Sequence, residues 1–266
     1  MSVAIFALLV FASLLLILSL AQERIVFQPP KNFTRADTGF AKRIEYQAAD
    51  GQPLVGFVIH PPSPSRHVLL CFHGNADLAA WQLDWGREAA AISGHSVFLA
   101  EYRGYYGLGG RPTYARSRLD ADAAYRAAME EARADAANIS FFGHSLGSAV
   151  AAELALRSAP RRLLLQAPFS SARGMGRLII GRPLLLLWNR LSRVHFDNVR
   201  AVTALDAAVS VVHGERDRIV PLRMGKEVYA AAKLKGVLLV VPAAGHNDLP
   251  DLGGDSYWRW LNDALG

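Results

Sequence analysis

Short apolar runs rich in β-branched residues alternate along most of this chain with alanine-rich segments that have helical spacing of their apolar residues. This alternation predicts an α/β domain, because strand, helix and strand in succession favour a parallel sheet. The eight expected strands are residues 42–48, 54–60, 67–72, 96–102, 138–142, 162–166, 209–213 and 237–242. The five expected helices are residues 80–93, 116–134, 146–158, 223–232 and 256–264. We therefore expect a doubly wound, mostly parallel sheet, with ligands bound at the carboxyl ends of its strands.

The composition indicates one large folded domain. The 266 residues are 52% hydrophobic and 20% charged, so the chain can bury a sizeable core. Cys71 is the only cysteine and lies inside an expected strand, which excludes a cysteine-built metal site and indicates a small buried residue. Asp50 and Gly51 separate the first two expected strands and are typical of a hairpin turn, so we expect the sheet to begin with an antiparallel pair.

An uncharged apolar stretch at residues 3–21 is long enough to cross the hydrocarbon core of a bilayer as a helix. We interpret residues 1–24 as a single-pass transmembrane anchor that precedes one folded domain at residues 25–266. The alternative is a signal peptide cleaved after Ala21, which would give a secreted or periplasmic protein. Basic residues follow the stretch and none precedes it, so the positive-inside rule places the domain in the cytoplasm.

The sequence Gly143-His144-Ser145-Leu146-Gly147 stands between an expected strand and an expected helix. In that context G-x-S-x-G is typical of a serine nucleophile held on a sharp turn. The two glycines allow strand and helix to approach closely, and the helix N-terminus favours developing negative charge. The pattern predicts that Ser145 is a nucleophile.

A serine hydroxyl needs a histidine base, and a carboxylate orients that base. Asp217 follows the seventh expected strand and His246 follows the eighth, in the chain order acid then histidine. We predict that Ser145, Asp217 and His246 form a catalytic triad, with Glu215 and Asp248 as the alternatives for the acid.

The third expected strand runs into His73-Gly74-Asn75-Ala76, at the position from which such a fold supplies an oxyanion-hole amide. Gly74 lets the backbone approach a substrate. We assign the oxyanion donors as the backbone N–H groups of Asn75, or alternatively Ala76, and of Leu146 after the nucleophile. The other interpretation of these residues is a plain turn that ends a strand.

Five motifs together resemble the N-terminally membrane-anchored α/β-hydrolase-domain serine hydrolases, a group similar to eukaryotic protein depalmitoylases and to many bacterial hydrolases. They are HGNA at 73–76, YRGYYG at 102–107 leading to Gly110-Arg111-Pro112, GHSLGSAVA at 143–151, HGERDRIVP at 213–221 and GHND at 245–248. The resemblance runs from about Phe40 to the end of the chain and implies the α/β-hydrolase fold. This chain departs from the family tract Y-R-G-Y-G by inserting Tyr106.

Residues 171–200 hold six arginines and one acid, together with an apolar run at residues 184–188. Lysines and stacking aromatics are sparse around them, which argues against a nucleic-acid groove. We expect a small helical cap at about 170–205, between the sixth and seventh strands. Its apolar side would line an acyl pocket over Ser145, and its arginines would face water or anionic lipid head groups. The alternative is a cap that only packs on the sheet.

Triad and resemblance together predict a membrane-anchored serine hydrolase that cleaves carboxylic esters or thioesters, with an acyl or lipid-like substrate. One alternative is a serine aminopeptidase-like hydrolase, since similar triads occur in aminopeptidases of this fold. The other is a non-catalytic α/β-hydrolase-like binding protein. No dinucleotide cofactor is expected, because no G-x-G-x-x-G follows a strand. No other cofactor, no metal and no nucleic-acid partner are expected either.

Overall fold

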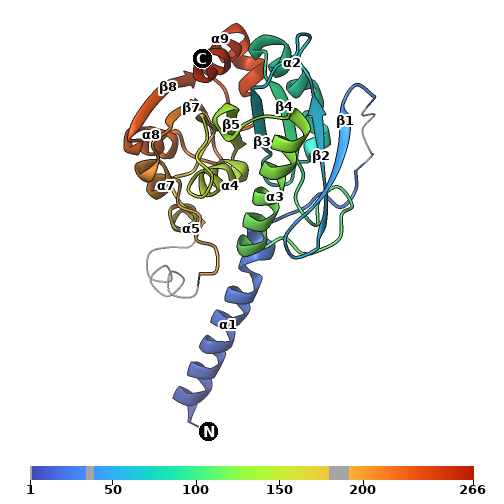
Figure 1. Ribbon diagram of the computed structural model, residues 1–266. Coiled ribbons are helices and arrows are strands. Elements are labelled where there is room, and N and C mark those ends of the chain that lie inside the picture. The colour runs from blue at the N-terminus through green and yellow to red at the C-terminus, as the bar shows by residue number, and fades with distance from the viewer. Residues whose placement is uncertain (1, 34–38, 180–191) are drawn as a thin grey trace.

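The computed structural model describes residues 2–33, 39–179 and 192–266, and an eight-stranded sheet forms its centre (Figure 1). The strand order is β1-β2-β4-β3-β5-β6-β7-β8. The strands are β1 (Lys42–Gln47), β2 (Pro53–Ile59), β3 (Val68–Phe72), β4 (Ser96–Ala100), β5 (Ile139–His144), β6 (Arg162–Gln166), β7 (Ala208–Gly214) and β8 (Leu234–Val241). Strand β2 is antiparallel to both β1 and β4, and the remaining neighbours are parallel. The predicted fold class and the predicted antiparallel opening pair are confirmed.

Helices cover both faces of this sheet. On one face α2 packs against α9, and on the other α3, α4, α7 and α8 contact one another in that order. The described helices are α1 (Val3–Val26), the 3₁₀ turns η1 (Ala79–Gln82) and η2 (Ala136–Asn138), α2 (Leu83–Ser93), α3 (Tyr114–Ala132), α4 (Leu146–Ala155), α5 (Ala172–Ile179), α7 (Asn198–Ala204), α8 (Leu222–Ala231) and α9 (Leu249–Leu265). Helix α9 begins earlier than predicted, because a kink at Gly254 joins two helical pieces across a glycine pair of low helix propensity.

The core is centred on β3, which lies between β4 and β5 with every residue buried. A strand covered by helices on both faces must be apolar throughout, and Val68–Phe72 meets this demand. Cys71 is a buried free cysteine in this strand, as predicted. The central position of β3 places the turn that follows it in the middle of the carboxyl edge of the sheet.

Helix α1 extends away from the body, and its N-terminus lies at the opposite end of the molecule from the C-terminus (Figure 1). Ile5, Phe6 and Leu9 on this helix are 52%, 57% and 53% exposed. None of the helices, taken over the residues that the structure describes, combines the length and apolarity that crossing a bilayer requires. The transmembrane anchor predicted at residues 1–24 is not supported by this finding.

The expected cap segment at residues 170–205 contains α5 and α7 in its described parts. Residues 180–191 of this segment, which include the apolar run at 184–188, lie outside the described residues. At the carboxyl side, Asn198 at the start of α7 is fully buried and donates from Nδ2 to the carbonyl of Phe169 at 2.8 Å. The described end of this segment is thus fastened to the loop after β6.

Candidate active site

Ser145 stands on a sharp turn between β5 and α4. Its backbone has φ +53° and ψ −114°, a conformation that non-glycine residues rarely adopt and that is typical of strained functional turns. The flanking glycines permit this turn. A Cβ on Gly143 would lie 2.2 Å from the carbonyl oxygen of Gly147, and one on Gly147 would lie 2.0 Å from that of Phe72. The predicted close approach of backbone at both glycines is present.

The structure brings Ser145, His246 and Asp217 together in one hydrogen-bonded series. Nε2 of His246 lies 2.8 Å from Oγ of Ser145, and Nδ1 of His246 lies 2.7 Å from Oδ2 of Asp217. These residues follow β5, β7 and β8, whose carboxyl ends meet at one edge of the sheet. The arrangement is suited to proton transfer from the serine hydroxyl to Nε2, with Nδ1–H donating to the carboxylate.

The carboxylate of Asp217 is buried and has several donors. Its Oδ1 accepts from the backbone N–H groups of Ile219 and Val220, both at 2.8 Å. Nε2 of His213 lies 3.3 Å from its Oδ2 and also donates to the carbonyl of Val220. Burial works against ionisation, but hydrogen bonds from His213 and His246 hold the pKa of Asp217 well below its ordinary value. The carboxylate is therefore charged across the physiological range.

The two alternative acids lie elsewhere. Glu215 is exposed, and its backbone N–H pairs with the carbonyl of Val241. Oδ1 of Asp248 accepts from the N–H of Gly245 at 2.7 Å, at the start of α9. Among the described contacts, neither carboxylate reaches His246. The geometry leaves Asp217 as the residue that orients this ring.

The turn after β3 lies against Ser145. A Cβ on Gly74 would meet Nδ1 of His144 at 3.0 Å and Cβ of Ser145 at 3.5 Å. Within the described residues, the backbone N–H groups of Asn75 and Ala76 make no hydrogen bond, and that of Leu146 is the first of a helix and has no partner inside it. Unpaired N–H groups beside a nucleophile are what an oxyanion hole requires.

His73 holds this turn in place through two hydrogen bonds that were not predicted from the sequence. Its Nε2 lies 2.7 Å from Oε1 of Glu101 and its Nδ1 lies 2.8 Å from the carbonyl oxygen of Gly74. The carbonyl of Gly74 can only accept and a Glu101 carboxylate also accepts, so this pair of contacts favours a ring protonated at both nitrogens. Burial opposes this charge, but the Glu101 carboxylate raises the pKa of His73 above its ordinary value. The signal in the sequence was an acid, Glu101, at the end of an otherwise apolar strand.

His144 lies between the turn after β3 and His246. Its Nε2 donates to the carbonyl of His246 at 3.2 Å, and the two rings are 5.1 Å apart. Burial, together with the neighbouring His246, lowers the pKa of His144 to about 3. The ring is therefore neutral and holds the loop that carries His246 without competing for its proton.

An open cleft of about 1080 Å³ contains Ser145 and His246. It runs between α2 and the start of α9 over the carboxyl ends of β3 and β5. Besides Phe72 at the end of β3, its large aromatic side chains are Trp81, Trp85, Phe142 and Trp258, which we call the aromatic wall. No described residue of the segment 170–205 lines it. The aromatic wall comes instead from η1, α2, β5 and α9, and the covering of Ser145 by the cap stays a prediction.

The described residues contain no group of three or more histidine, cysteine, aspartate or glutamate side chains placed to hold a metal ion.

The inserted Tyr106 of the YRGYYG tract has φ +52° and is nearly buried. Its ring stacks on Phe33 at 5.5 Å and meets Phe57 edge-on at 5.6 Å. The insertion is therefore accommodated by packing against the chain that follows α1.

Comparison with known proteins agrees with this architecture, although no family model matches the sequence. The uncharacterized protein Rv2307c of Mycobacterium tuberculosis is 33% identical over 270 residues, which cover 98% of this chain and 94% of that protein. The alpha/beta hydrolase domain-containing protein WAV2 of Arabidopsis thaliana is 28% identical over 229 residues, covering 80% of this chain and 74% of that protein. The esterase Pf2001 of Pyrococcus furiosus shares the fold with a TM-score of 0.68 at 18% identity, over 91% of this chain and 98% of that one. By sequence and by fold, the chain belongs to the α/β-hydrolase superfamily.

Proposed function

We propose that this protein is a serine hydrolase that cleaves carboxylic esters or thioesters through an acyl-enzyme on Ser145. The observation that carries the proposal is the unbroken hydrogen-bonded series from Ser145 through His246 to Asp217. A weak nucleophile, a base and an orienting carboxylate stand in the order that nucleophilic catalysis requires.

In the first half of the reaction, Ser145 Oγ attacks the carbonyl carbon while its proton passes to Nε2 of His246. The backbone N–H groups of Asn75 and Leu146 stabilise the negative oxygen of the tetrahedral intermediate. His246 then gives its proton to the departing alcohol or thiol, and an acyl-enzyme remains. In the second half, His246 takes a proton from water while the water oxygen attacks the acyl carbonyl. The C–Oγ bond of the second tetrahedral intermediate then breaks as His246 returns the proton to Ser145 Oγ, and the carboxylic acid is released.

The cleft supports an acyl or lipid-like substrate. Its volume of about 1080 Å³ exceeds the space that an acetyl group fills, and substrate sites of this size hold ligands of roughly drug size. Trp85 contacts Phe142 with ring centroids 4.7 Å apart, and the ring centroid of Trp258 lies 6.5 Å from that of Trp85. A continuous aromatic wall next to the nucleophile favours a long apolar chain over a short one.

A serine aminopeptidase-like hydrolase is the second candidate, because carboxylates also line the cleft. Asp77 and Asp84 are already engaged, by Gln82 and Arg87 respectively. Glu88 and Asp251 line the cleft without an ion pair to any described residue. Cleavage of aminoacyl p-nitroanilides faster than the matching acyl esters would favour this candidate over the esterase.

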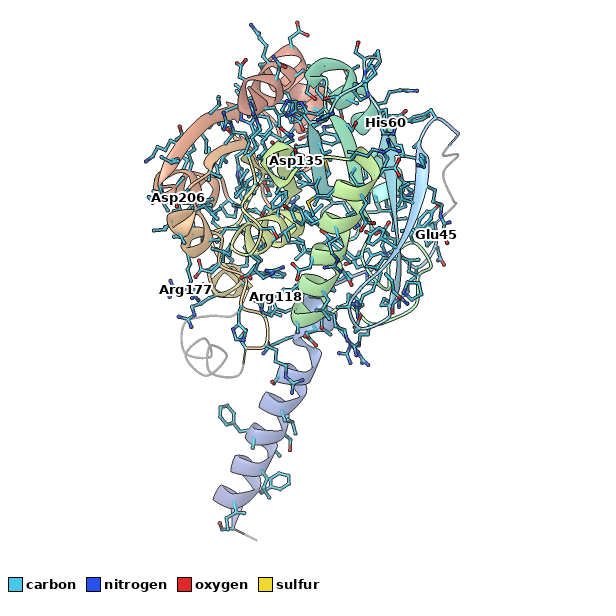
Figure 2. All side chains as sticks on the ribbon, viewed as in Figure 1. Glu45, His60, Arg118, Asp135, Arg177 and Asp206 are labelled. Carbon is cyan, nitrogen blue, oxygen red and sulfur yellow. The ribbon has the colours of Figure 1, made fainter. Side chains whose placement is uncertain are left out.

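Attachment to a membrane through α1 completes the proposal. The exposed apolar side chains of Phe6 and Leu9 support it, as does the projection of α1 from the body. Figure 2 shows Arg118 and Arg177 toward the end of the body from which α1 extends, where they would meet anionic head groups. Flotation with anionic vesicles should retain the full chain, and a Phe6→Glu, Leu9→Glu variant should be released; equal flotation of both would contradict attachment through α1.

A fluorophosphonate probe and a series of p-nitrophenyl esters test the catalytic proposal. The protein should be labelled, and Ser145→Ala should lose both labelling and turnover while keeping its unfolding transition, since it removes one hydroxyl. Ser158→Ala, after the far end of α4, is the matched control and should behave as the unaltered protein. A folded Ser145→Ala variant that still turns over esters would refute the proposal.

A further inference from the structure

The chain that leaves α1 makes a direct contact with residues 73–76, the turn after β3 that carries the proposed oxyanion donor and that we call the oxyanion turn. The backbone N–H of Gln28 donates to Oδ1 of Asn75 at 2.8 Å. The hydroxyl of Tyr105 donates to the same oxygen at 2.9 Å. These donors lie 47 and 30 residues from Asn75 in the sequence, so the turn is held by two separate parts of the fold.

Two donors on one amide oxygen fix the side chain of Asn75. A carbonyl oxygen has two lone pairs, and both are occupied here. A backbone N–H can only donate, so the contact from Gln28 also settles that the oxygen, and not the amide nitrogen, faces it. His73 restrains the residue before Asn75 through the carbonyl of Gly74. The peptide group that carries the proposed oxyanion donor is therefore restrained on both sides.

The donors themselves are firmly placed. Phe27, next to Gln28, is 3% exposed and contacts the ring of Phe196 at 6.4 Å. Pro29 follows Gln28 and restricts it to extended backbone. Tyr105 is fully buried, with its ring 5.5 Å from that of His73. Neither donor can follow Asn75 if that side chain moves, so each hydrogen bond acts as a restraint.

We propose that Asn75 is a positioning residue, held by the N–H of Gln28 and the hydroxyl of Tyr105, so that the chain leaving α1 forms part of the oxyanion hole. The inference rests on the proposed function, because the oxyanion concerned is the one that forms when Ser145 attacks an acyl carbon. It also means that α1 is not a separable tether. Its carboxyl end is joined through Gln28 to the group that stabilises the transition state.

Gln28→Pro is the decisive substitution, because proline has no backbone N–H and favours the extended backbone that Pro29 already imposes. It also removes the Gln28 side chain, whose Nε2 donates to the carbonyl of Ile25 at 2.8 Å, and Gln28→Ala removes that bond too. Gln28→Ala keeps the N–H and is the matched control. Tyr105→Phe removes the other donor. Loss of a whole oxyanion donor costs about 10²- to 10³-fold in kcat, so loosening one should cost about 10-fold. We expect that loss in Gln28→Pro and Tyr105→Phe, with KM within about twofold and Gln28→Ala unchanged.

Affinity for a trifluoromethyl ketone provides a readout that a merely structural role would not move. The ketone forms a tetrahedral oxyanion with the serine, so its Ki should rise by the same factor as kcat falls. Asn75→Ala tests the acceptor without touching the chain after α1, and adding Gln28→Pro to it should cause no further loss. This variant decides the matter if Gln28→Pro does not fold.

Three results would overturn the inference: unchanged kcat in folded Gln28→Pro, Tyr105→Phe or Asn75→Ala; a change confined to KM; or an equal loss in Gln28→Ala. Failure of the proposed function looks different. There, Ser145→Ala would keep the activity of the unaltered protein, whereas the inference fails with Ser145→Ala inactive and kcat insensitive to these substitutions.

Discussion

Replacing Gly147 by alanine separates the demands of packing from those of catalysis. The new Cβ would lie 2.0 Å from the carbonyl oxygen of Phe72 and 2.6 Å from that of His73, where ordinary contact begins near 3.4 Å. Both oxygens belong to backbone, so neither can rotate away. The shortfall of about 1.4 Å at Phe72 must be met by moving α4 away from the end of β3.

The magnitudes differ between stability and rate. Overpacking costs about 1–3 kcal/mol, but alanine in place of glycine within a helix gains about 1 kcal/mol, so the free energy of unfolding should fall by only about 0–2 kcal/mol. The same movement draws Ser145 and Leu146 away from Asn75. Since a displacement of 1 Å can cost about 10²-fold in rate, we expect kcat/KM to fall about 100-fold.

Urea unfolding and p-nitrophenyl ester hydrolysis measure the two quantities on one preparation. Gly109→Ala is the control, because a Cβ there meets nothing within 4 Å and the backbone is not left-handed. It should leave both quantities unchanged. Near-normal kcat/KM in folded Gly147→Ala would refute the argument that the Ser145 turn and the turn at residues 73–76 are held at a fixed distance by backbone contact.

Three further predictions follow from the site. Asp217→Asn should lower kcat by about 10³- to 10⁴-fold by misorienting His246, whereas Glu215→Gln and Asp248→Asn should each cost less than about tenfold; a large loss at either of these acids would reassign the role. The raised pKa of His73 contributes stability that is fully present below the unfolded-state pKa of about 6.5 and is lost as pH rises through the folded-state pKa. The difference in unfolding free energy between the protein and His73→Asn should therefore shrink with rising pH. A difference independent of pH would contradict the charged ring. Trp85→Ala should lower kcat/KM about tenfold more for p-nitrophenyl octanoate than for the acetate, and equal losses would remove the aromatic wall as the chain-binding surface.

Whether each element is a helix or a strand was predictable from the sequence, because an element that buries one face or both has a characteristic local spacing of apolar residues. The run that became β3 is apolar throughout, and β5 is apolar apart from Ser140 and its last residue, His144. The turns after β5, β7 and β8 carry Ser145, Asp217 and His246 in a recognisable order. The order β2-β4-β3 was not predicted, since it depends on how helices pack on the sheet and leaves no periodic signal. The aromatic wall was missed for the same reason, as Trp85 and Trp258 meet only after α2 and α9 have packed together.

The two halves of the site are rigid for different physical reasons, and this explains which half could be foreseen. Ser145 is held by its own neighbours, because Gly143 and Gly147 let backbone touch backbone, and such a demand is written in five consecutive residues. The oxyanion turn is held by Glu101 through His73, and Asn75 is held by donors far away in the sequence. A change in the first half must displace backbone and so affects both stability and rate. A change in the second half removes one hydrogen bond to a side chain and should affect rate first.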